Sequence, residues 1–240
     1  MRRKSYQAME MNLQNWKTLP LGDFEHSNAI LQSEWEVPSR HAQLQSLESI
    51  LATWRTYHTQ HDSFKEPLSY SCFLDNGQQH IIHLSQWKDR HSIENFEKND
   101  SPERVNELLK NTEVKRLGKQ VYSPFATYKE SASVDDTRLV VFVKQFFQQS
   151  GQAAEWIELI LQTLRQEGEH AGLIQNTYFL NEDKTELLNY AFWMSESEYD
   201  DFLQHKNPAT KDNWRKIKSF EGWLKSKGRV RKCNEFIRIQ

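Results

Sequence analysis

Three side chains that can hydrogen-bond to a small molecule lie close together in the last quarter of the chain. Asn189 and Trp193 are four residues apart in a largely apolar run, and Tyr199 follows six residues later. On a regular strand Asn189 and Trp193 point to the same face, because side chains alternate between the two faces. An amide, an indole N–H and a phenol around one cavity can hold a planar phenolic molecule and hydrogen-bond to its oxygens. The spacing therefore predicts a candidate site at these three residues.

Each of the three residues also has a purely structural interpretation. Trp193 can be a core residue of the fold, and Tyr199 can pack against the core from one face of a helix. Asn189 separates the two interpretations, because a buried amide among apolar strand neighbours is costly unless it has a partner. Asn189 is therefore the residue that favours a ligand site over simple packing.

The segments around these residues predict the element order β-α-β-β-α-β. Alternation and β-branched runs indicate the strands, and apolar residues at helical spacing indicate the helices. Ser195, with Glu198 three residues on, has the pattern of a capping box at the start of the second helix. The expected elements are a strand at Leu139–Phe147, a helix with Trp156, Leu159, Ile160 and Leu164 on one face, strands at Ile174–Leu180 and Glu186–Trp193, a helix after Ser195, a helical stretch at Lys211–Lys225 and a strand at Val230–Ile239.

The same pattern occurs earlier in the chain at a constant offset. Sliding the sequence by 106 positions (179 − 73 = 106) places Phe73–Asp75 on Phe179–Asn181 and Trp87 on Trp193. Self-similarity that keeps turns as well as apolar positions in register indicates an internal repeat. Further pairs at this offset are Trp35 with Val141, Val37 with Val143 and Ile50 with Trp156. We therefore expect two copies of one module.

The first copy is predicted to contain the same elements. They are a strand at Ala29–Val37, a helix striped by Leu44, Leu47, Leu51, Trp54 and His58, strands at Leu68–Leu74 and His80–Trp87, a helix with Ile93 and Phe96, extra helical turns at Pro102–Asn111 and a strand at Gln120–Tyr128. Ser131–Asp136 is polar and is interpreted as the linker between the copies. Residues 1–26 lie outside the repeat and form an arm or a covering helix.

A β-α-β-β-α-β module forms an antiparallel sheet with both helices on one face, so its other face stays apolar and must be covered. Two modules on one chain can cover each other. We predict an α+β protein in which tandem ferredoxin-like modules, at residues 27–130 and 137–240, pair into a dimeric α+β barrel within one chain. Such a chain is expected to fold as a monomer, with further oligomerisation left open.

The first copy departs from the second at the candidate site. The positions that match Asn189, Trp193 and Tyr199 are His83, Trp87 and Ile93 at the offset of 106 (189 − 83 = 106). An aliphatic side chain in place of the phenol cannot hydrogen-bond. The first copy is therefore expected to be a structural partner with a degenerate or different site, and His83 is interpreted as a hydrogen-bonded strand histidine.

Composition excludes several classes of function. A formal charge of −2, from 31 basic and 33 acidic residues, gives no electrostatic footprint for nucleic acid or an anionic membrane. No apolar run approaches the roughly 20 residues that cross a bilayer, and the basic N-terminal residues are not followed by the apolar stretch of a signal peptide. The two cysteines are not at metal-ligand spacing, so a reducing, cytoplasmic location is expected. The sequence also lacks the phosphate-binding, dinucleotide-binding, zinc-protease and nucleophile-elbow motifs.

The strand and helix around Asn189 carry a family resemblance. Asn189-Tyr190-Ala191, Trp193, Ser195-Glu196 and Tyr199 resemble a stretch of the cofactor-free, quinone-forming monooxygenases of polyketide antibiotic pathways, and the likeness extends over about residues 28–240. These enzymes are the antibiotic-biosynthesis-monooxygenase type of the dimeric α+β barrel superfamily. The resemblance implies an aromatic substrate, O₂, no cofactor and no metal. It implies that Asn189, Trp193 and Tyr199 line the substrate cavity, with Arg215 as a weaker candidate for proton relay or anion stabilisation.

Two other functions remain open. The chain could be a barrel that binds a small apolar ligand without turnover, as the degenerate first copy suggests. The haem-degrading members of the superfamily are the third possibility, with an Asn, a helical Trp and a His about ten residues later. The helix positions that match that Trp are Phe96 and Phe202, followed ten residues on by Asn106 and Asp212, and His205 is out of register. These departures argue against haem degradation by that triad.

Overall fold

The computed structural model describes residues 24, 27–60, 67–99, 113–204 and 207–238. Within these ranges the chain forms the predicted β-α-β-β-α-β order twice. The first half contains β1 (Ala29–Glu36), α2 (Arg40–Gln60), β2 (Ser69–Leu74), β3 (His80–Trp87), α3 (Arg90–Asn99) and β4 (Lys115–Lys129). The second half contains β5 (Leu139–Phe146), α5 (Gln152–Glu167), β6 (Leu173–Leu180), β7 (Glu186–Trp193), α6 (Glu196–Gln204), α7 (Lys211–Lys218), β8 (Arg229–Cys233) and β9 (Glu235–Arg238).

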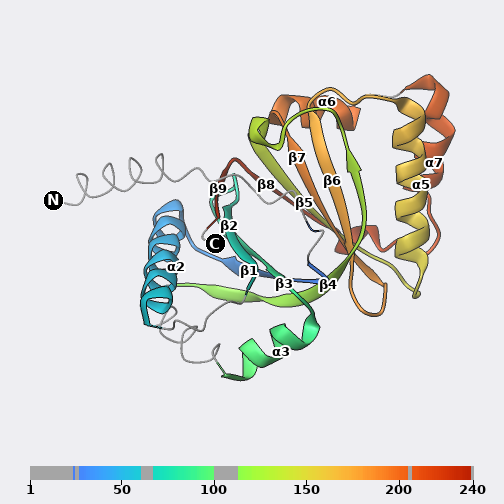
Figure 1. The fold of residues 1–240 in the computed structure, drawn as a ribbon. Coiled ribbons are helices and arrows are strands. Elements are labelled where there is room, and N and C mark those ends of the chain that lie inside the picture. The colour runs from blue at the N-terminus through green and yellow to red at the C-terminus, as the bar shows by residue number, and fades with distance from the viewer. Residues whose placement is uncertain (1–23, 25–26, 61–66, 100–112, 205–206, 239–240) are drawn as a thin grey trace.

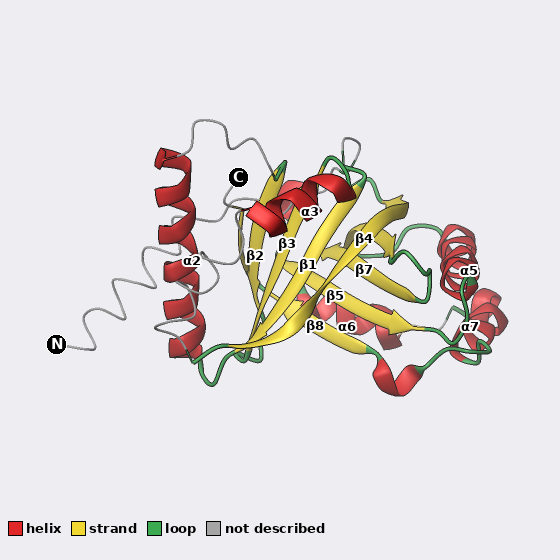
Figure 2. Cartoon of the chain, turned by 90° about the horizontal axis from the view of Figure 1, so that it is seen from below, coloured by secondary structure: helices red, strands yellow, loops and turns green. Residues whose placement is uncertain are grey.

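The strands form one antiparallel sheet that curls into a barrel. Its nine strands have the order β8-β5-β7-β6-β4-β1-β3-β2-β9 (Figure 1). The first and last strands in this order, β8 and β9, are separated along the chain only by Asn234, so the two edges of the sheet meet. The helices cover the outside of this sheet, with α2 at one end and α5 and α7 at the other (Figure 2). The predicted α+β barrel within one chain is thus confirmed.

The halves of the barrel are joined at two junctions. The first part of β4 pairs with β1, and its second part, from Ser123 to Lys129, pairs with β6 of the other half. At the other junction β8 pairs with β5, while β9 pairs with β2 of the first half. Each half therefore supplies one strand to the sheet of the other. Because of these exchanges, the division of the chain at residues 27–130 and 137–240 stays a prediction.

The two hairpins keep the offset of 106 in their pairing. Phe73 is opposite Ile82, and Phe179 is opposite Leu188 (179 − 73 = 106; 188 − 82 = 106). Their turns use the same chemistry, in which a side-chain oxygen accepts two backbone N–H groups. Asp75 Oδ1 accepts from the residues at 79 and 80, and Asn181 Oδ1 accepts from those at 185 and 186.

The first strands do not keep this offset. Ala29 lies opposite Trp87, and Leu139 lies opposite Trp193, so the first strands are related by 110 positions (139 − 29 = 110). The predicted strand pairs Trp35 with Val141 and Val37 with Val143 are therefore wrong, and the helix pair Ile50 with Trp156 stays a prediction. The four-residue difference falls between the first and second strands, where the first copy has a longer helix, α2 with 21 residues against 16 in α5.

Element limits differ from the prediction at the long strands. The predicted strand at Gln120–Tyr128 extends over Lys115–Lys129, and the predicted last strand is divided into β8 and β9 at Asn234. The predicted helical stretch Lys211–Lys225 is helical only to Lys218 before an irregular segment and a short turn. The arm, apart from Phe24, and the extra turns at Pro102–Asn111 lie outside the described residues.

The barrel interior is an apolar core built from both halves. It contains Ile30, Phe73, Ile82, Leu84 and Tyr122 from the first half and Val140, Phe142, Ile174, Phe179, Leu188, Tyr190, Phe192 and Cys233 from the second. Phe24 packs against this core, with its ring centroid 4.9 Å from that of Phe179. The apolar faces of the two halves of the sheet therefore cover each other, as the sequence predicts.

One polar atom in the barrel interior leads to a stability prediction. The Tyr190 hydroxyl is buried and has no hydrogen-bond partner among the described residues, and burial raises its pKa well above the ordinary value. Tyr190→Phe removes an unsatisfied group, so the free energy of unfolding should rise by about 1–2 kcal/mol in a denaturant titration. The matched control is Tyr122→Phe, because the Tyr122 hydroxyl donates to Glu186 and its loss should destabilise. A destabilised Tyr190→Phe variant would mean that this hydroxyl has a partner.

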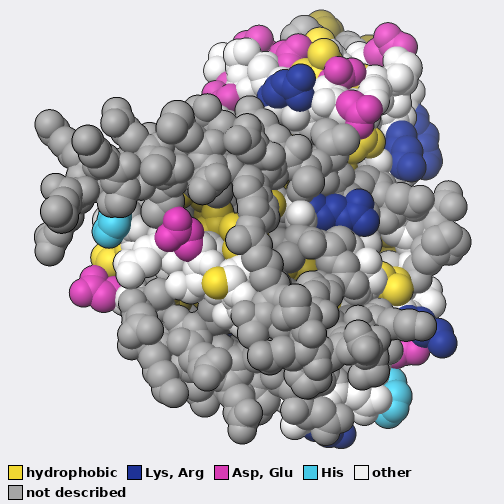
Figure 3. All heavy atoms as spheres, turned by 60° about the vertical axis from the view of Figure 1, so that its left-hand side comes forward, with side chains coloured by type: hydrophobic (Ala, Val, Ile, Leu, Met, Phe, Trp, Pro, Cys, Tyr) yellow, Lys and Arg dark blue, Asp and Glu magenta, His cyan; other side chains and the backbone are white. Residues whose placement is uncertain are grey.

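Charged side chains of both signs lie on the described surface. On the face drawn in Figure 3, acidic and basic side chains lie near one another among the described atoms. Within the described ranges, none of the helices is long and apolar enough to cross a bilayer. The same ranges contain no group of three His, Cys, Asp or Glu side chains placed to hold a metal ion.

Candidate functional site

Asn189 and Trp193 lie on the helix-covered face of β7. Their neighbours Leu188, Tyr190 and Phe192 belong to the barrel interior, so the alternation of the strand turns Asn189 and Trp193 outward. Trp193 packs in an apolar cluster with Tyr199 of α6. The candidate site therefore lies between the sheet of the second half and its helices, outside the barrel.

A small polar cluster surrounds Asn189. Tyr178 of β6 lies directly opposite Asn189 in the strand pairing. The Tyr178 hydroxyl accepts a hydrogen bond from Asn176 Nδ2 at 2.7 Å and is also hydrogen-bonded to the Asn189 side chain. Burial raises the pKa of Tyr178 above its ordinary value, so the phenol is neutral near neutral pH. Two amides thus converge on one buried phenol.

Three atoms of this face lack hydrogen-bond partners. Asn176 Oδ1, Asn189 Oδ1 and Trp193 Nε1 are all buried, and none is bonded to another described residue. Each buried, unsatisfied polar group costs about 1–3 kcal/mol. Asn189 as a whole is only half-buried, whereas Trp193 is 2% exposed. Two acceptors and one donor on one face are therefore without partners among the described residues, and such buried groups call for an explanation.

Tyr199 is brought to this face, as predicted. Its ring centroid lies 5.4 Å from that of Trp193, in an edge-on arrangement. Ser195 Oγ accepts the backbone N–H of Glu198, so the predicted cap starts the helix that positions Tyr199. Burial raises the pKa of Tyr199, while Lys232 Nζ lies 5.0 Å from the ring centroid. Tyr199 can therefore act as a neutral donor.

Arg215 does not join the other three residues. Its side chain is 67% exposed, and its Nη1 lies 2.8 Å from Asp212 Oδ1. It lines a pocket formed by residues of α6 and α7. No contact links it to Asn189 or Trp193 among the described residues. The predicted role of Arg215 therefore depends on whether the pocket that it lines is connected to the candidate site.

Phe202 separates Trp193 from both pockets. Its ring centroid lies 5.2 Å from Trp193, 5.4 Å from His170 and 6.0 Å from Trp214. Phe202 lines both pockets and is only half-buried. In the sequence, Phe202 stands out only as the aromatic residue that matches Phe96 at the offset of 106.

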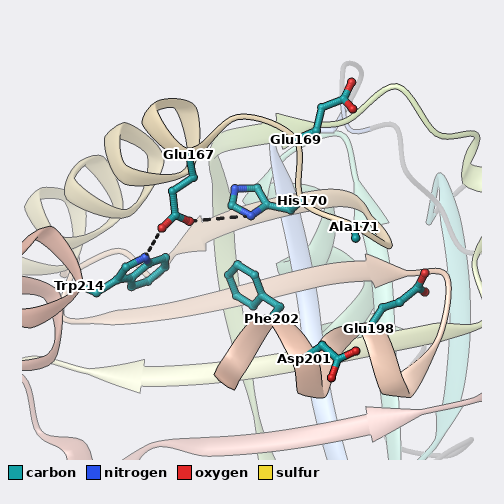
Figure 4. Close-up of a pocket in the computed structure, with 8 residues that line it drawn as sticks. All are labelled: Glu167, Glu169, His170, Ala171, Glu198, Asp201, Phe202 and Trp214. Carbon is teal, nitrogen blue, oxygen red and sulfur yellow. Dashed lines mark hydrogen bonds and ion pairs between the residues drawn. The ribbon is translucent and has the colours of Figure 1, made fainter. Parts of the chain in front are cut away.

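The first pocket is acidic and has a volume of about 250 Å³. Its lining residues are Glu167, Glu169, His170, Ala171, Glu198, Asp201, Phe202 and Trp214 (Figure 4). We call it the acidic pocket. It lies where the end of α5 meets α6 and α7, and Gly168 and Gly172, both with positive φ, bracket the loop that carries His170.

Glu167 organises the acidic pocket. It accepts a hydrogen bond from Trp214 Nε1 at 2.7 Å and another from the Thr210 hydroxyl. Its Oε2 lies 3.9 Å from His170 Nδ1, and His170 Nε2 lies 3.3 Å from the Leu164 carbonyl oxygen (Figure 4). The sequence offers only the two glycines as a sign of this site, because its residues come from three separate elements.

The second pocket is basic and has a volume of about 380 Å³. Phe202, Leu203, Lys211, Trp214, Arg215, Lys218 and Ser219 line it. We call it the basic pocket. It shares Phe202 and Trp214 with the acidic pocket, so the two cavities are neighbours on either side of these rings.

The first half carries a different cluster at the matching positions. Tyr70, Cys72 and His83 correspond to Asn176, Tyr178 and Asn189 (176 − 70 = 106; 178 − 72 = 106; 189 − 83 = 106). The Tyr70 hydroxyl lies 2.6 Å from His83 Nδ1, and Cys72 Sγ lies 3.6 Å from the same atom. Burial lowers the pKa of His83 to about 3 and raises that of Cys72 to about 12. Both groups are therefore neutral near neutral pH.

Comparison with solved structures defines the fold class. No protein-family model matches the chain, and no curated protein is similar to it in sequence. An anthrone oxidase-like protein superposes with a TM-score of 0.61 at 10% identity, over 89% of this chain and 93% of that one. A provisionally assigned monooxygenase of Fusobacterium nucleatum gives 0.55 at 10%, over 90% and 94%. Another, of Lactobacillus acidophilus, gives 0.52 at 10%, over 89% and 95%.

These matches extend over both halves of the barrel. The chain therefore has the α+β barrel fold of monooxygenase-like proteins, and the resemblance to the antibiotic-biosynthesis-monooxygenase type is confirmed for the fold. At 10% identity the likeness concerns the fold alone, and function has to be argued from the site.

Proposed function

We propose that this protein is a cofactor-independent monooxygenase that oxidises an electron-rich phenolic or polycyclic molecule with O₂. The site is the helix-covered face of β7 in the second half. The observation that carries the proposal is the set of three buried, unpartnered atoms, on Asn176, Asn189 and Trp193. The anthrone oxidase-like and monooxygenase-like proteins of the same fold agree with it.

The proposed reaction needs no metal, because the ionised substrate itself supplies electrons to O₂. One CH₂ carbon of the substrate loses two hydrogens and gains one oxygen atom as a carbonyl. The second oxygen atom leaves as water. The protein then has to orient the ring, hold the substrate oxygens and stabilise the negative charge that develops on them.

The polar face supplies the groups for these tasks. Trp193 Nε1 is a donor to a phenolic or quinonoid oxygen, and Asn189 Oδ1 is an acceptor for a substrate hydroxyl. Tyr199 beside Trp193 is a second donor. Arg215 remains a candidate for anion stabilisation from the basic pocket. Preorganised donors in an enclosed site are effective because little reorganisation is needed when charge develops.

Substrate access requires Phe202 to move. The acidic pocket, at about 250 Å³, is below the roughly 300–1,000 Å³ of typical ligand sites. The ring of Phe202 lies between that pocket and Trp193. Turning this ring would join the cavity to the polar face and make room for a fused-ring substrate.

A barrel that binds a ligand without turnover is the second candidate. The observation that favours it is that the ring of Phe202 covers Trp193. Neither pocket is lined by Asn189 or Trp193, so a ligand in either pocket does not contact the proposed reactive groups. An anthrone incubated with the protein and O₂ in metal-free buffer separates the two candidates. The monooxygenase proposal expects quinone formation well above the buffer rate, and binding without product would favour the ligand carrier. Titration with haemin tests the haem alternative, which would give a Soret band.

Trp193→Phe tests the indole as a donor. The change removes Nε1 but keeps an aromatic ring in the apolar cluster, so turnover should fall about tenfold, the effect of roughly one hydrogen bond. The free energy of unfolding should also fall, by about 1 kcal/mol, because the smaller ring fills less of the site. Trp87→Phe is the matched control in the first half, where Nε1 donates to Ser85 Oγ at 2.8 Å. If both variants keep full turnover, Trp193 has only a packing role.

A further inference from the structure

The basic pocket combines an apolar floor with a basic rim. Phe202, Leu203 and Trp214 form the floor, and Leu203 is 56% exposed although it is a large apolar residue. The volume of about 380 Å³ lies within the usual range of small-molecule sites. An exposed apolar floor inside a cavity of this size fits the flat face of an aromatic ring.

The rim of this pocket is positively charged on one side of α7. Lys211, Arg215 and Lys218 occupy positions separated by four and three residues, so they lie on one face of the helix with Trp214. Asp212 contacts Arg215 but does not line the pocket. Among the described residues, the lining therefore contains three cationic side chains and no carboxylate.

The neighbouring acidic pocket has the opposite charge. Its lining contains four carboxylates, Glu167, Glu169, Glu198 and Asp201 (Figure 4). The two cavities share only Phe202 and Trp214. An anionic ligand is attracted to one side of these rings and repelled from the other. This arrangement gives a charged aromatic ligand one preferred orientation.

We infer that the basic pocket binds the acidic group of an aromatic acid, such as a carboxylate, sulfonate or phenolate. Lys211, Arg215 and Lys218 hold the anion, while the ring lies on Leu203, Phe202 and Trp214. With the anion fixed at α7, the rest of the ring system points past Phe202 toward Trp193. The inference rests on the proposed function for this orientation, because it names the charge of the substrate that the site accepts.

Binding of two fluorescent probes tests the inference on the whole chain. Anilinonaphthalene sulfonate carries a negative charge, and phenylnaphthylamine is a neutral molecule of similar shape. The triple variant Lys211→Gln, Arg215→Gln, Lys218→Gln should bind the anionic probe about tenfold more weakly. The loss of affinity is no larger because each exposed ion pair adds only a modest amount of binding free energy. The neutral probe should keep its affinity. Added salt should weaken only the anionic probe, since these charges are exposed.

The matched control changes the same net charge elsewhere. Lys216→Gln, Lys225→Gln, Lys227→Gln removes three positive charges from α7 and the following turn, at positions that do not line the pocket. This variant should bind both probes like the parent protein. Leu203→Glu, which places a carboxylate in the floor, should weaken the anionic probe more than the neutral one, while its exposed position leaves the fold intact.

Each outcome decides the inference. An anionic probe that binds equally well to the parent and the triple variant, or loses affinity equally in the control, would overturn it. So would a Leu203→Glu variant with unchanged affinity. If the protein binds the anionic probe selectively but does not turn over phenols, the anion site is supported and the proposed monooxygenase function is wrong. If it turns over a neutral anthrone but shows no preference for the anionic probe, the monooxygenase function is supported and the anion site is wrong.

Discussion

Asn189→Ala is expected to lower the rate of phenol oxidation by ~10²-fold, because Asn189 Oδ1 is the acceptor that orients the substrate hydroxyl and a misplaced substrate loses about this factor in rate. Asn189 Oδ1 is buried without a partner, so the truncation removes a group that the folded protein leaves unsatisfied. The Tyr178 hydroxyl keeps its hydrogen bond from Asn176. Thermal stability should therefore stay close to that of the parent protein. Initial rates with an anthrone, together with a melting curve, measure both quantities.

The control for Asn189→Ala is His83→Ala at the matching position of the first half. His83 is buried and hydrogen-bonded to Tyr70, so its loss should lower stability and leave turnover nearly unchanged. The site would move to the first half if His83→Ala abolished turnover while Asn189→Ala kept it. Equal losses in both variants would point to a general effect on the fold.

The isolated second half, Asp136–Gln240, is expected not to form a folded monomer. Without the first half, β6 loses its pairing with β4, and an unpaired strand edge is a site of association. The interior side chains of Phe142, Phe179 and Phe192 also lose their cover. Burial of each such side chain is worth about 1.5–3 kcal/mol, against a net stability of about 5–15 kcal/mol for a whole domain.

Sedimentation of the fragment and of the whole chain measures this effect. The whole chain should sediment as a folded monomer, because its own halves close the barrel. The fragment should unfold or form dimers in which a second copy supplies the missing cover. A folded, monomeric fragment would contradict the interpretation of the barrel as two interdependent halves.

Local patterns predicted most of the fold and part of the site. Alternation along β7 placed Asn189 and Trp193 on one face, and the cap at Ser195 placed Tyr199 beside Trp193, because these relations depend on neighbours in the chain. The side-chain partners of Asn189 could not be predicted in this way. Asn176 and Tyr178 meet it through strand pairing, which a single sequence does not specify.

The rest of the site depends on contacts between distant elements. Glu167, Phe202 and Trp214 come from α5, α6 and α7, and no spacing in the sequence relates them. The exchange of β4 and β9 between the halves has the same cause, because the length of a strand does not reveal which sheet it joins. The offset of 106 likewise held for the hairpins, whose turns fix the register, and failed at the first strands.

The most direct test of the central claim is the source of oxygen in the product. Metal-free protein would be mixed with an anthrone under heavy-isotope O₂, quenched before the carbonyl exchanges with water, and the quinone analysed by mass spectrometry. A monooxygenase at the Asn189 face predicts one labelled oxygen atom per product, formed rapidly by the parent protein and at no more than a few per cent of that rate by Asn189→Ala. Product that takes its new oxygen from water, or that forms equally fast without the protein, would contradict the account.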